Sequence, residues 1–406
     1  MADPRLQVWL GEDHIGVLER RRGRLRFAYT DSARSSLPIG APLLSCSLPL
    51  DGRPLDGLAF FEGLLPEGQH RADLAARADV TASDTLGLLA RYGRDIAGAV
   101  TLLGEDRPDQ RVPGVVPLSD GDLHDELVGL PERALGVHDD SELSLAGLQD
   151  KLLLVQLPGG GWGRPTGGYP STHIIKRDPP RYPGVVAAEA QCTRLARAVG
   201  LTSIDVEVLT VDGVDHLVVE RFDRRVERGS VVRIHQEDTC QALGVLPSAK
   251  YETRHGGGGP ELSQIASLLN RFAADPLDAL DRLARIATFT ALIGNADAHG
   301  KNVALLHPEP GVVELAPLYD QVPTRMWPTL QAQASMTISA GLDLDTVTPD
   351  RIAAEAKAWD FTPNRALEAA VTTAEAVRSA CADGTIDPEG AVATFVRART
   401  ERFLAR

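Results

Sequence analysis

The order of the expected secondary structure constrains the fold of this chain more than any other feature. Before Pro260, apolar residues form short runs with two-residue spacing, as in VWLGEDHIGVLE around the turn residue Gly11, which is typical of antiparallel strands. Helical patterns also occur in this half, from about Gly57 and at residues 185–199. After Pro260 long helices dominate, and we expect them around residues 261–273, 276–294, 363–381 and 387–404. This order predicts a two-lobed α+β fold, with a small β-rich N-terminal subdomain and a mostly helical C-terminal lobe.

The chain is long enough for more than one packed unit. A single hydrophobic core stops growing at about 250–300 residues, and this chain has 406. A charged, proline-containing stretch near residues 104–117 is the expected linker. Farther on, the runs KLLLVQL and THIIK predict a hairpin closed by a glycine-rich loop. We predict an N-terminal subdomain of sheet and helices, a linker, a strand-rich core and a helical lobe, at residues 1–104, 105–140, 141–255 and 256–406.

Composition limits the classes of function. The formal net charge is −14, which repels a phosphate backbone and argues against an autonomous DNA-binding protein. The four cysteines are scattered without a CxxC motif, so neither a zinc site nor a disulfide framework is expected. The sequence has no apolar run of the roughly 20 residues that a membrane span needs, and its start lacks the pattern of a signal peptide. We therefore expect a cytoplasmic protein.

The most informative segment is IGNADAHGKN, residues 293–302. Its Asp297 and Asn302 have the spacing D-x-x-x-x-N that protein kinases use for the catalytic base and a magnesium-binding amide. This match alone is weak, because Asp and Asn are common in turns. Asp320 closes an apolar run 18 positions beyond Asn302, where kinases place a second magnesium-binding carboxylate. Together the three residues predict a site for magnesium-dependent phosphoryl transfer.

Other residues fit the remaining parts of such a site. Lys176 ends a strand and Glu189 lies on the next helix, and kinases pair such residues while the lysine contacts the phosphates. A surface lysine and a surface glutamate are the alternative interpretation. Lys301 lies inside the loop with Asp297 and is placed to balance developing negative charge. Glu220 and Phe222, at the end of HLVVERF, are candidates for a hinge that holds adenine, although their composition alone indicates only the end of a strand.

The segment SELSLAGLQDKLLLV, residues 141–155, stands where a phosphate-covering loop is expected. Its only glycine is Gly147, so the segment matches neither the G-x-G-x-x-G nor the Walker pattern. Its exposed amides would be able to cradle phosphate oxygens. From the residues alone, the segment is a polar turn that leads into a strand.

The motifs SLAGLQDK, THIIK, VERFDR, HQEDTCQALG, IGNADAHGKN and LAPLYD occur here in the order found in HipA-family kinases, which this chain resembles over residues 6–400. VWLGEDHIGVLE, FFEGLLPEG and YGRDIAGAV are similar to the HipA N-terminal module. The resemblance implies a protein-kinase-like fold, ATP and Mg²⁺ as cofactors, and a serine/threonine target. It also implies that Asp297 accepts the proton and that Asn302 and Asp320 bind magnesium. The nucleotide-binding residues that it implies are Ala146, Gly147, Leu148, Gln149, Asp150, Lys151, Lys176, Glu189, Glu220, Phe222, His299, Lys301, Asn302 and Asp320.

The same resemblance implies regulation and partners. Ser144 matches a serine that family members autophosphorylate, which would displace the phosphate loop and inactivate the enzyme. The implied role is that of the toxin of a HipA/HipB-type toxin-antitoxin system, restrained by a HipB-like helix-turn-helix antitoxin and reaching operator DNA only through it. The implied substrate is a translation-related protein such as an aminoacyl-tRNA synthetase. Two departures are modest: Asp150 replaces the more usual Glu, and Asn295-Ala296 precedes Asp297 where members vary.

Two other functions fit the same residues. Phosphoryl-transfer groups also serve kinases that act on small molecules, and a deep closed acceptor pocket would favour that class. A non-enzymatic co-repressor that binds an antitoxin is the second alternative. The presence of Lys176, Asp297, Asn302 and Asp320 together argues against it.

Overall fold

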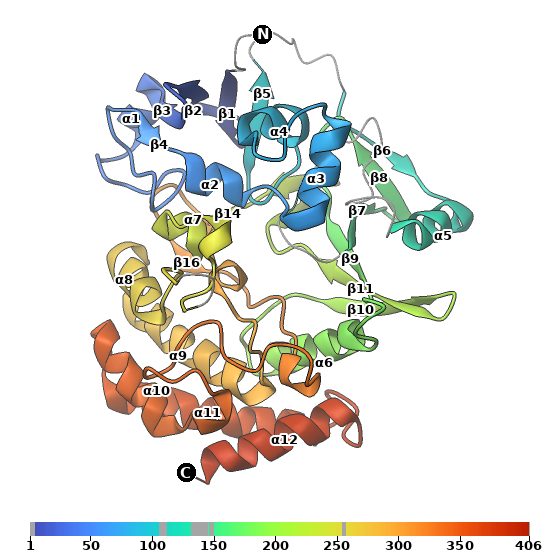
Figure 1. Cartoon of the computed structure of the whole chain (residues 1–406), viewed down its shortest axis with the longest axis vertical. Coiled ribbons are helices and arrows are strands. Elements are labelled where there is room, and N and C mark those ends of the chain that lie inside the picture. The colour runs from blue at the N-terminus through green and yellow to red at the C-terminus, as the bar shows by residue number, and fades with distance from the viewer. Residues whose placement is uncertain (1–4, 105–111, 131–144, 146–149, 254–256, 406) are drawn as a thin grey trace. The chain divides into compact units, whose positions relative to one another are not determined.

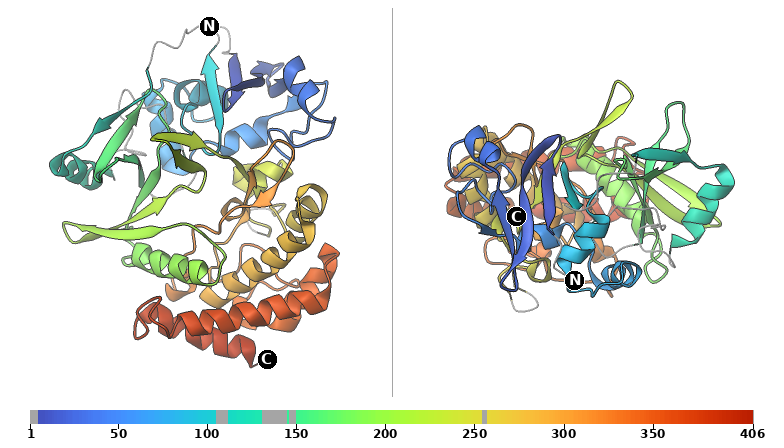
Figure 2. Two further views of the ribbon diagram at one scale, coloured as in Figure 1. Left: turned by 180° about the vertical axis from the view of Figure 1, so that it is seen from behind. Right: turned by 90° about the horizontal axis from the view of Figure 1, so that it is seen from above.

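The computed structural model describes residues 5–104, 112–130, 145, 150–253 and 257–405. The chain forms two compact units, whose elements are labelled in Figure 1 and seen from two further directions in Figure 2. Unit 1 comprises Met1–Pro179, Leu209–Glu237 and Leu306–Gly311, and unit 2 comprises Pro180–Val208, Asp238–Leu305 and Val312–Arg406. In the described part of the chain, no helix is both long and apolar enough to cross a membrane. The four domain limits expected from the sequence stay a prediction.

The first sheet of unit 1 has five strands in the order β4-β3-β2-β1-β5, with antiparallel pairing throughout. Gly11 and Gly23 occupy the turns with φ of 60° and 77°, a backbone region that favours glycine. At Gly16 a Cβ atom would approach the Phe27 ring to 2.4 Å, so only glycine fits there. The strands are β1 Leu6–Leu10, β2 Asp13–Arg21, β3 Arg24–Tyr29, β4 Leu55–Asp56 and β5 Val100–Gly104.

Short helices accompany this sheet and help to form its core. The apolar faces of the strands and helices are buried together, with Leu6, Leu18, Phe27 and Phe61 almost fully inaccessible to solvent. Removing such apolar surface from water is the main force that holds a sheet against its helices. The helices are α1 Asp31–Ser36, α2 Leu58–Gly63, α3 Gly68–Arg77 and α4 Thr85–Tyr92.

The second sheet, most of which belongs to unit 1, has six strands in the order β10-β11-β9-β7-β8-β6. The predicted pairing of KLLLVQL with THIIK is confirmed, because β7 and β9 are antiparallel neighbours. The glycine-rich connection was expected to be a loop, but it contains strand β8, which pairs with β7 and β6. The described part of the expected linker contains β6 and the helix α5, Asp120–Val128. The strands are β6 Gly114–Pro117, β7 Lys151–Gln156, β8 Trp162–Thr166, β9 His173–Arg177, β10 Val206–Val211 and β11 Val214–Glu220.

A buried ionic cluster lies within unit 1, formed by Asp95, Ser171, Arg221, Asp223 and Arg224, all at most 6% exposed. Arg224 donates to Asp95 at 2.9 Å, and Arg221 donates to both oxygens of Asp223 at 2.9 Å. Ser171 donates to Asp95 through its hydroxyl at 2.7 Å. Burial opposes ionisation of Asp223, but Arg221 and Arg224 outweigh it and hold the pKa of that carboxyl well below its usual range. We call this group the Asp95–Asp223 cluster.

A second buried polar group in unit 1 surrounds Glu237, which is fully inaccessible to solvent. Its carboxylate accepts hydrogen bonds from Ser45 Oγ at 2.5 Å, Cys46 N at 2.9 Å and His307 Nε2 at 3.0 Å. The nearby His235 donates from Nε2 to the carbonyl oxygen of residue 44 at 2.7 Å. His235 and Glu237 lie on strand β14, His235–Asp238, and His307 lies on strand β15, Ala304–His307. Each of these two strands has residues in both units, because the limits of the units fall after Glu237 and before Leu306. The other short strands are β12 Arg224–Glu227, β13 Ser230–Arg233 and β16 Glu314–Leu315.

Unit 2 is mainly helical, as predicted. Its central helix α9, Pro276–Ile293, begins at the cap residue Asp275 and ends at Gly294, which has a φ of 69°. These are the start and stop signals expected of a helix. Helix α9 packs against α8, α10, α11 and α12 (Figure 1). The remaining helices are α6 Val185–Ala198, α7 Thr239–Leu243, α8 Leu262–Phe272, α10 Pro349–Ala356, α11 Pro363–Ala380 and α12 Ala391–Leu404.

Candidate active site

The loop after α9 carries the predicted catalytic aspartate. Gly294 ends the helix in the left-handed region and turns the chain into residues 295–299. The amide of Asp297 donates to Asn295 Oδ1 at 3.1 Å, and its carbonyl accepts from His299 N at 2.7 Å. One residue earlier, Ala296 N donates to Thr324 Oγ1 at 2.8 Å. The loop backbone that presents Asp297 is therefore fixed on both sides of that residue.

The structure brings the two predicted magnesium ligands together. Asn302 belongs to the short 3₁₀ helix Gly300–Asn302, and Asp320 follows the segment after β16. Asn302 Nδ2 donates to Asp320 Oδ2 at 2.5 Å, although the residues are 18 positions apart. Asn295 Nδ2 donates to the carbonyl of Asp320 at 3.3 Å and fixes its backbone.

Two features of this pair fit a magnesium ion. Asn302 Oδ1 is buried and has no hydrogen-bond partner among the described residues, and a buried orphan acceptor calls for a donor or a cation. Asp320 has a φ of 58°, and strained backbone of this kind often occurs at functional sites. Magnesium is usually bound by one or two carboxylates together with substrate phosphates. Among the described residues no group of three or more His, Cys, Asp or Glu is placed to hold a metal ion.

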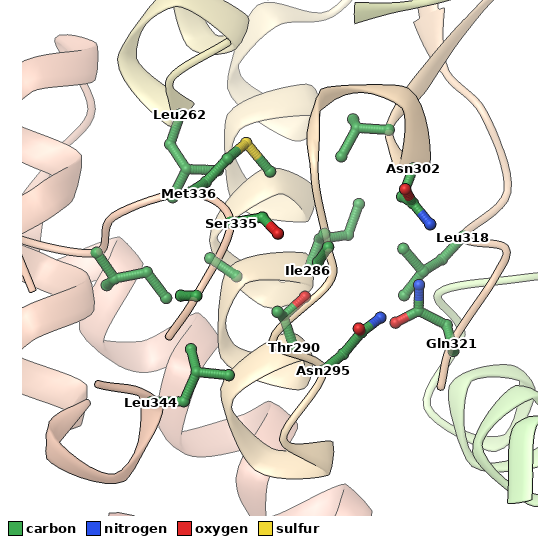
Figure 3. A pocket seen from close by; sticks show the side chains of 15 residues that line it. Leu262, Ile286, Thr290, Asn295, Asn302, Leu318, Gln321, Ser335, Met336 and Leu344 are labelled. Carbon is green, nitrogen blue, oxygen red and sulfur yellow. The ribbon is translucent and has the colours of Figure 1, made fainter. Parts of the chain in front are cut away.

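A small cavity of about 20 Å³ lies next to the pair, within unit 2 (Figure 3). Asn302 and Gln321 line one side, and Leu262 and Met336 line the opposite side. Gln321 Oε1 is another buried acceptor without a partner among the described residues. A space of this size holds one or two waters. It is far too small for an acceptor molecule or a nucleotide.

The structure places Lys301 against a carboxylate. Its ammonium donates to Asp238 Oδ2 at 2.7 Å, and the two side chains are only 6% and 11% exposed. Asp238 also caps helix α7, accepting from Gln241 N at 2.9 Å. This pairing anchors the active-site loop to α7. The predicted role of Lys301 in balancing phosphate charge stays a prediction.

His299 lies in the same loop and is 9% exposed. Burial, together with the nearby positive charge of Lys250, lowers its pKa to about 3. The ring is therefore neutral near pH 7. Its Nδ1 has no hydrogen-bond partner among the described residues, so His299 offers a neutral polar atom rather than a cation.

Tyr251 is a site residue that the sequence did not reveal. Its hydroxyl donates to Asp297 Oδ1 at 3.1 Å, and its ring packs edge-on against His299 with centroids 5.2 Å apart. In the sequence it lies shortly before a run of four glycines, residues 256–259. No spacing rule connects a tyrosine to an aspartate 46 positions later.

Other predicted site residues belong to unit 1. Lys176 lies on β9 as expected, beside Lys151 on β7 and Leu217 on β11. Asp150 accepts a hydrogen bond from His70 Nε2 at 3.0 Å. Glu220 ends β11 and is exposed, and Phe222 is half-buried.

The remaining predicted residues belong to either unit or lie outside the described part of the chain. Glu189 is buried on α6 in unit 2, whereas Lys176 belongs to unit 1, so their pairing stays a prediction. The predicted autophosphorylation residue and most of the predicted phosphate loop lie outside the described residues; these are Ser144, Ala146, Gly147, Leu148 and Gln149.

The fold and this loop can be compared with known proteins. The model of the HipA-like C-terminal domain matches residues 143–381, and that of the HipA N-terminal domain matches residues 6–103. The chain belongs to the HipA family. The resemblance noted in the sequence is thereby confirmed.

Relatives of this HipA-family chain are kinases. It is 31% identical over 366 residues to the serine/threonine-protein kinase toxin HipA of Shewanella oneidensis, covering 86% of this chain and 82% of the relative. It is 38% identical over 359 residues to the putative kinase Y4mE of Sinorhizobium fredii, covering 85% and 83%. The structure matches a chain of the Shewanella oneidensis complex of HipA, HipB and operator DNA with a TM-score of 0.81, at 28% identity and covering 98% and 96% of the two chains. The protein is a HipA-like serine/threonine kinase with the predicted α+β, kinase-like fold.

Proposed function

We propose that this kinase uses Mg²⁺ and ATP, with Asp297 as catalytic base and Asn302 and Asp320 as magnesium ligands. The observation that carries the proposal is the contact between Asn302 and Asp320 at 2.5 Å, with the buried Asn302 Oδ1 left without a partner among the described residues. This pair lies in the same unit as the loop of Asp297. Paired oxygen ligands next to a carboxylate base are the recurring parts of phosphoryl transfer.

The reaction would proceed by direct transfer. The acceptor hydroxyl gives its proton to the carboxylate of Asp297 as its oxygen forms a bond to the γ-phosphorus, and the bond from that phosphorus to the ADP oxygen breaks. A bound magnesium ion would neutralise charge on the phosphates. Asn302 and Asp320 would hold that ion, and the hydrogen bonds to the backbone of Ala296 and Asp297 would keep the base in position.

The proposed biological role is that of a cytoplasmic toxin in a HipA/HipB-type toxin-antitoxin system. The matching Shewanella structure holds HipA together with HipB and operator DNA, which supports a HipB-like antitoxin as partner here. A net charge of −14 disfavours direct DNA binding, so operator contact would pass through the antitoxin. Inactivating autophosphorylation at Ser144 and a translation-related substrate, such as an aminoacyl-tRNA synthetase, remain parts of this proposal that rest on the family resemblance.

The decisive experiment incubates labelled ATP and host lysate with the native chain or with Asp297→Asn. We expect a labelled substrate band only with the native chain, and a fall in turnover of about 10²–10⁴-fold in the variant. Nucleotide binding should be nearly unchanged in Asp297→Asn, because the base acts on the acceptor hydroxyl. Asp320→Ala should instead weaken binding of Mg-ATP. Equal labelling by the native chain and Asp297→Asn would refute the assignment of the base.

A further inference from the structure

The segment Lys250–Glu252 contacts the active-site loop at several points. The carbonyl of Lys250 accepts from Gly300 N at 3.1 Å. Tyr251 OH donates to Asp297 Oδ1 at 3.1 Å. The carboxylate of Glu252 accepts from the amide of Thr337 at 2.5 Å and from its hydroxyl at 2.7 Å. Successive residues of one short segment are thus held by the loop and by the chain near residue 337.

Tyr251 is the residue of this segment that reaches the reacting group. A phenol that donates to one oxygen of a carboxylate restricts rotation of that carboxylate. A general base must lie within hydrogen-bond reach of the proton that it accepts, so a freely rotating carboxylate would spend less time in the productive orientation. The hydrogen bond from Tyr251 therefore restricts the directions in which the carboxylate oxygens of Asp297 point.

The loop backbone does not depend on Tyr251. The carbonyl of Ala296 accepts from Ser335 Oγ and from Gln331 Nε2, both at 2.8 Å. The amide of Ala296 donates to Thr324 Oγ1 at 2.8 Å. Removing the phenolic oxygen would leave these contacts in place, together with the ring contact to His299. The hydroxyl of Tyr251 thus affects the side chain of Asp297 rather than the path of the loop.

We propose that Tyr251 is a positioning residue for the catalytic step, orienting the carboxylate of Asp297 toward the acceptor hydroxyl. This inference rests on the proposed function, in which Asp297 is the base. Tyr251 exchanges no proton with the substrate. It acts through Asp297 by holding one carboxylate oxygen, so that the proton of the acceptor passes to an oriented base.

The test is a comparison of Tyr251→Phe with the native kinase in the same labelled-ATP assay. Loss of a hydrogen bond to a charged group should lower kcat about tenfold or more. The KM for ATP and the Kd for Mg-ADP should stay within about twofold, because Tyr251 holds the base and not the nucleotide. In the Asp297→Asn background Tyr251→Phe should cause no further loss of kcat, since the carboxylate that Tyr251 orients is gone.

Tyr92→Phe is the matched control: it removes a tyrosine hydrogen bond to the carbonyl of Leu74 in unit 1 and should leave kcat unchanged.

The outcomes separate this inference from the function on which it rests. If Asp297→Asn is inactive but Tyr251→Phe turns over like the native chain, the positioning role is wrong and the proposed base stands. A parallel loss of kcat, nucleotide affinity and thermal midpoint in Tyr251→Phe would also overturn it, because that pattern marks a general structural role. If Asp297→Asn keeps full activity, both the base assignment and the role of Tyr251 fail.

Discussion

The two units each bury a polar group of side chains, but the two groups differ in how completely they are paired. In the Asp95–Asp223 cluster of unit 1, every carboxylate oxygen accepts a hydrogen bond, including one from Gly98 N to Asp223 at 2.7 Å. In the active-site loop of unit 2, buried atoms of Asn302 and His299 have no partner among the described residues. Within this cluster, as far as the structure describes it, only Arg224 Nε lacks a partner, and the other two nitrogens of that guanidinium group donate hydrogen bonds.

This difference separates a structural group from a reactive one. Buried charges that satisfy one another fix one arrangement of the chain and leave nothing for a ligand. Buried polar atoms without partners cost free energy, and a fold keeps them mainly where a ligand or reaction uses them. Changes in the first group should therefore affect folding, and changes in the second should affect chemistry.

The largest expected effect is on the stability of unit 1. Asp223→Ala removes one carboxylate and leaves Arg221 and Arg224 buried without it, which should lower the free energy of unfolding by about 3–5 kcal/mol. Denaturant unfolding measures this change. Asp51→Ala is the control, because the half-buried Asp51 accepts a hydrogen bond from Arg53 N in its own loop; it should change stability by less than about 0.5 kcal/mol. If Asp223→Ala lowers the free energy of unfolding by less than about 1 kcal/mol, the paired charges of this cluster do not have the structural role assigned to them.

A smaller effect is expected from pH, through His235 beside Glu237. Burial, and then the nearby His307, lower the pKa of His235 to about 4. Between pH 6.5 and 4 the unfolded chain binds a proton here that the folded chain does not, so the free energy of unfolding falls as pH falls. At pH 4 the loss of stability is about 3 kcal/mol. His235→Gln, which keeps an N–H donor for the carbonyl of residue 44, should flatten the dependence of the thermal midpoint on pH in this range.

His124 provides a control of opposite sign. It lies on the surface, and hydrogen bonds to Asp125 and Asp212 raise its pKa. Its contribution is present at low pH and is lost as pH rises through the folded pKa. His124→Gln should therefore leave the loss of stability between pH 6.5 and 4 in place. If His235→Gln changes nothing in that range, another group causes the pH dependence.

Much of the fold was predictable because its signals are local. Asp275, Pro276 and Gly294 mark the ends of α9 within one stretch of sequence, and the turn glycines mark the first strands. The D-x-x-x-x-N spacing placed Asp297 and Asn302 in one loop for the same reason. The structure then brings Asp320 to Asn302, which the proposal that both residues bind one ion requires.

The rest depended on contacts between distant parts of the chain. The pairing of Lys301 with Asp238 joins residues 63 positions apart, and that of Tyr251 with Asp297 joins residues 46 apart. Neither follows from periodicity, because tertiary packing decides which side chains meet. Strand β8 was missed for a related reason: its sequence WGRPT contains Gly163 and Pro165, and it forms a strand because β7 and β6 pair with it.

The smallest expected effect concerns the backbone of Asp320. With a φ of 58°, this residue lies where a side chain is strained and glycine is not. Asp320→Ala and Asp320→Gly both remove the proposed magnesium ligand, so both should lose Mg-ATP affinity equally. The glycine variant should nevertheless be more stable than the alanine variant by about 1 kcal/mol, because it relieves the strain.

Asp360, with a φ of 57° and an exposed side chain, is the matched control: its glycine and alanine variants should differ in stability by a similar amount while kinase activity stays unchanged. Paired denaturant unfolding and nucleotide-binding curves for the four variants measure both quantities. If the alanine variant at 320 matches the glycine variant in stability while the pair at 360 differs, the backbone at Asp320 relaxes freely, and it is not a strained element held in place for the metal.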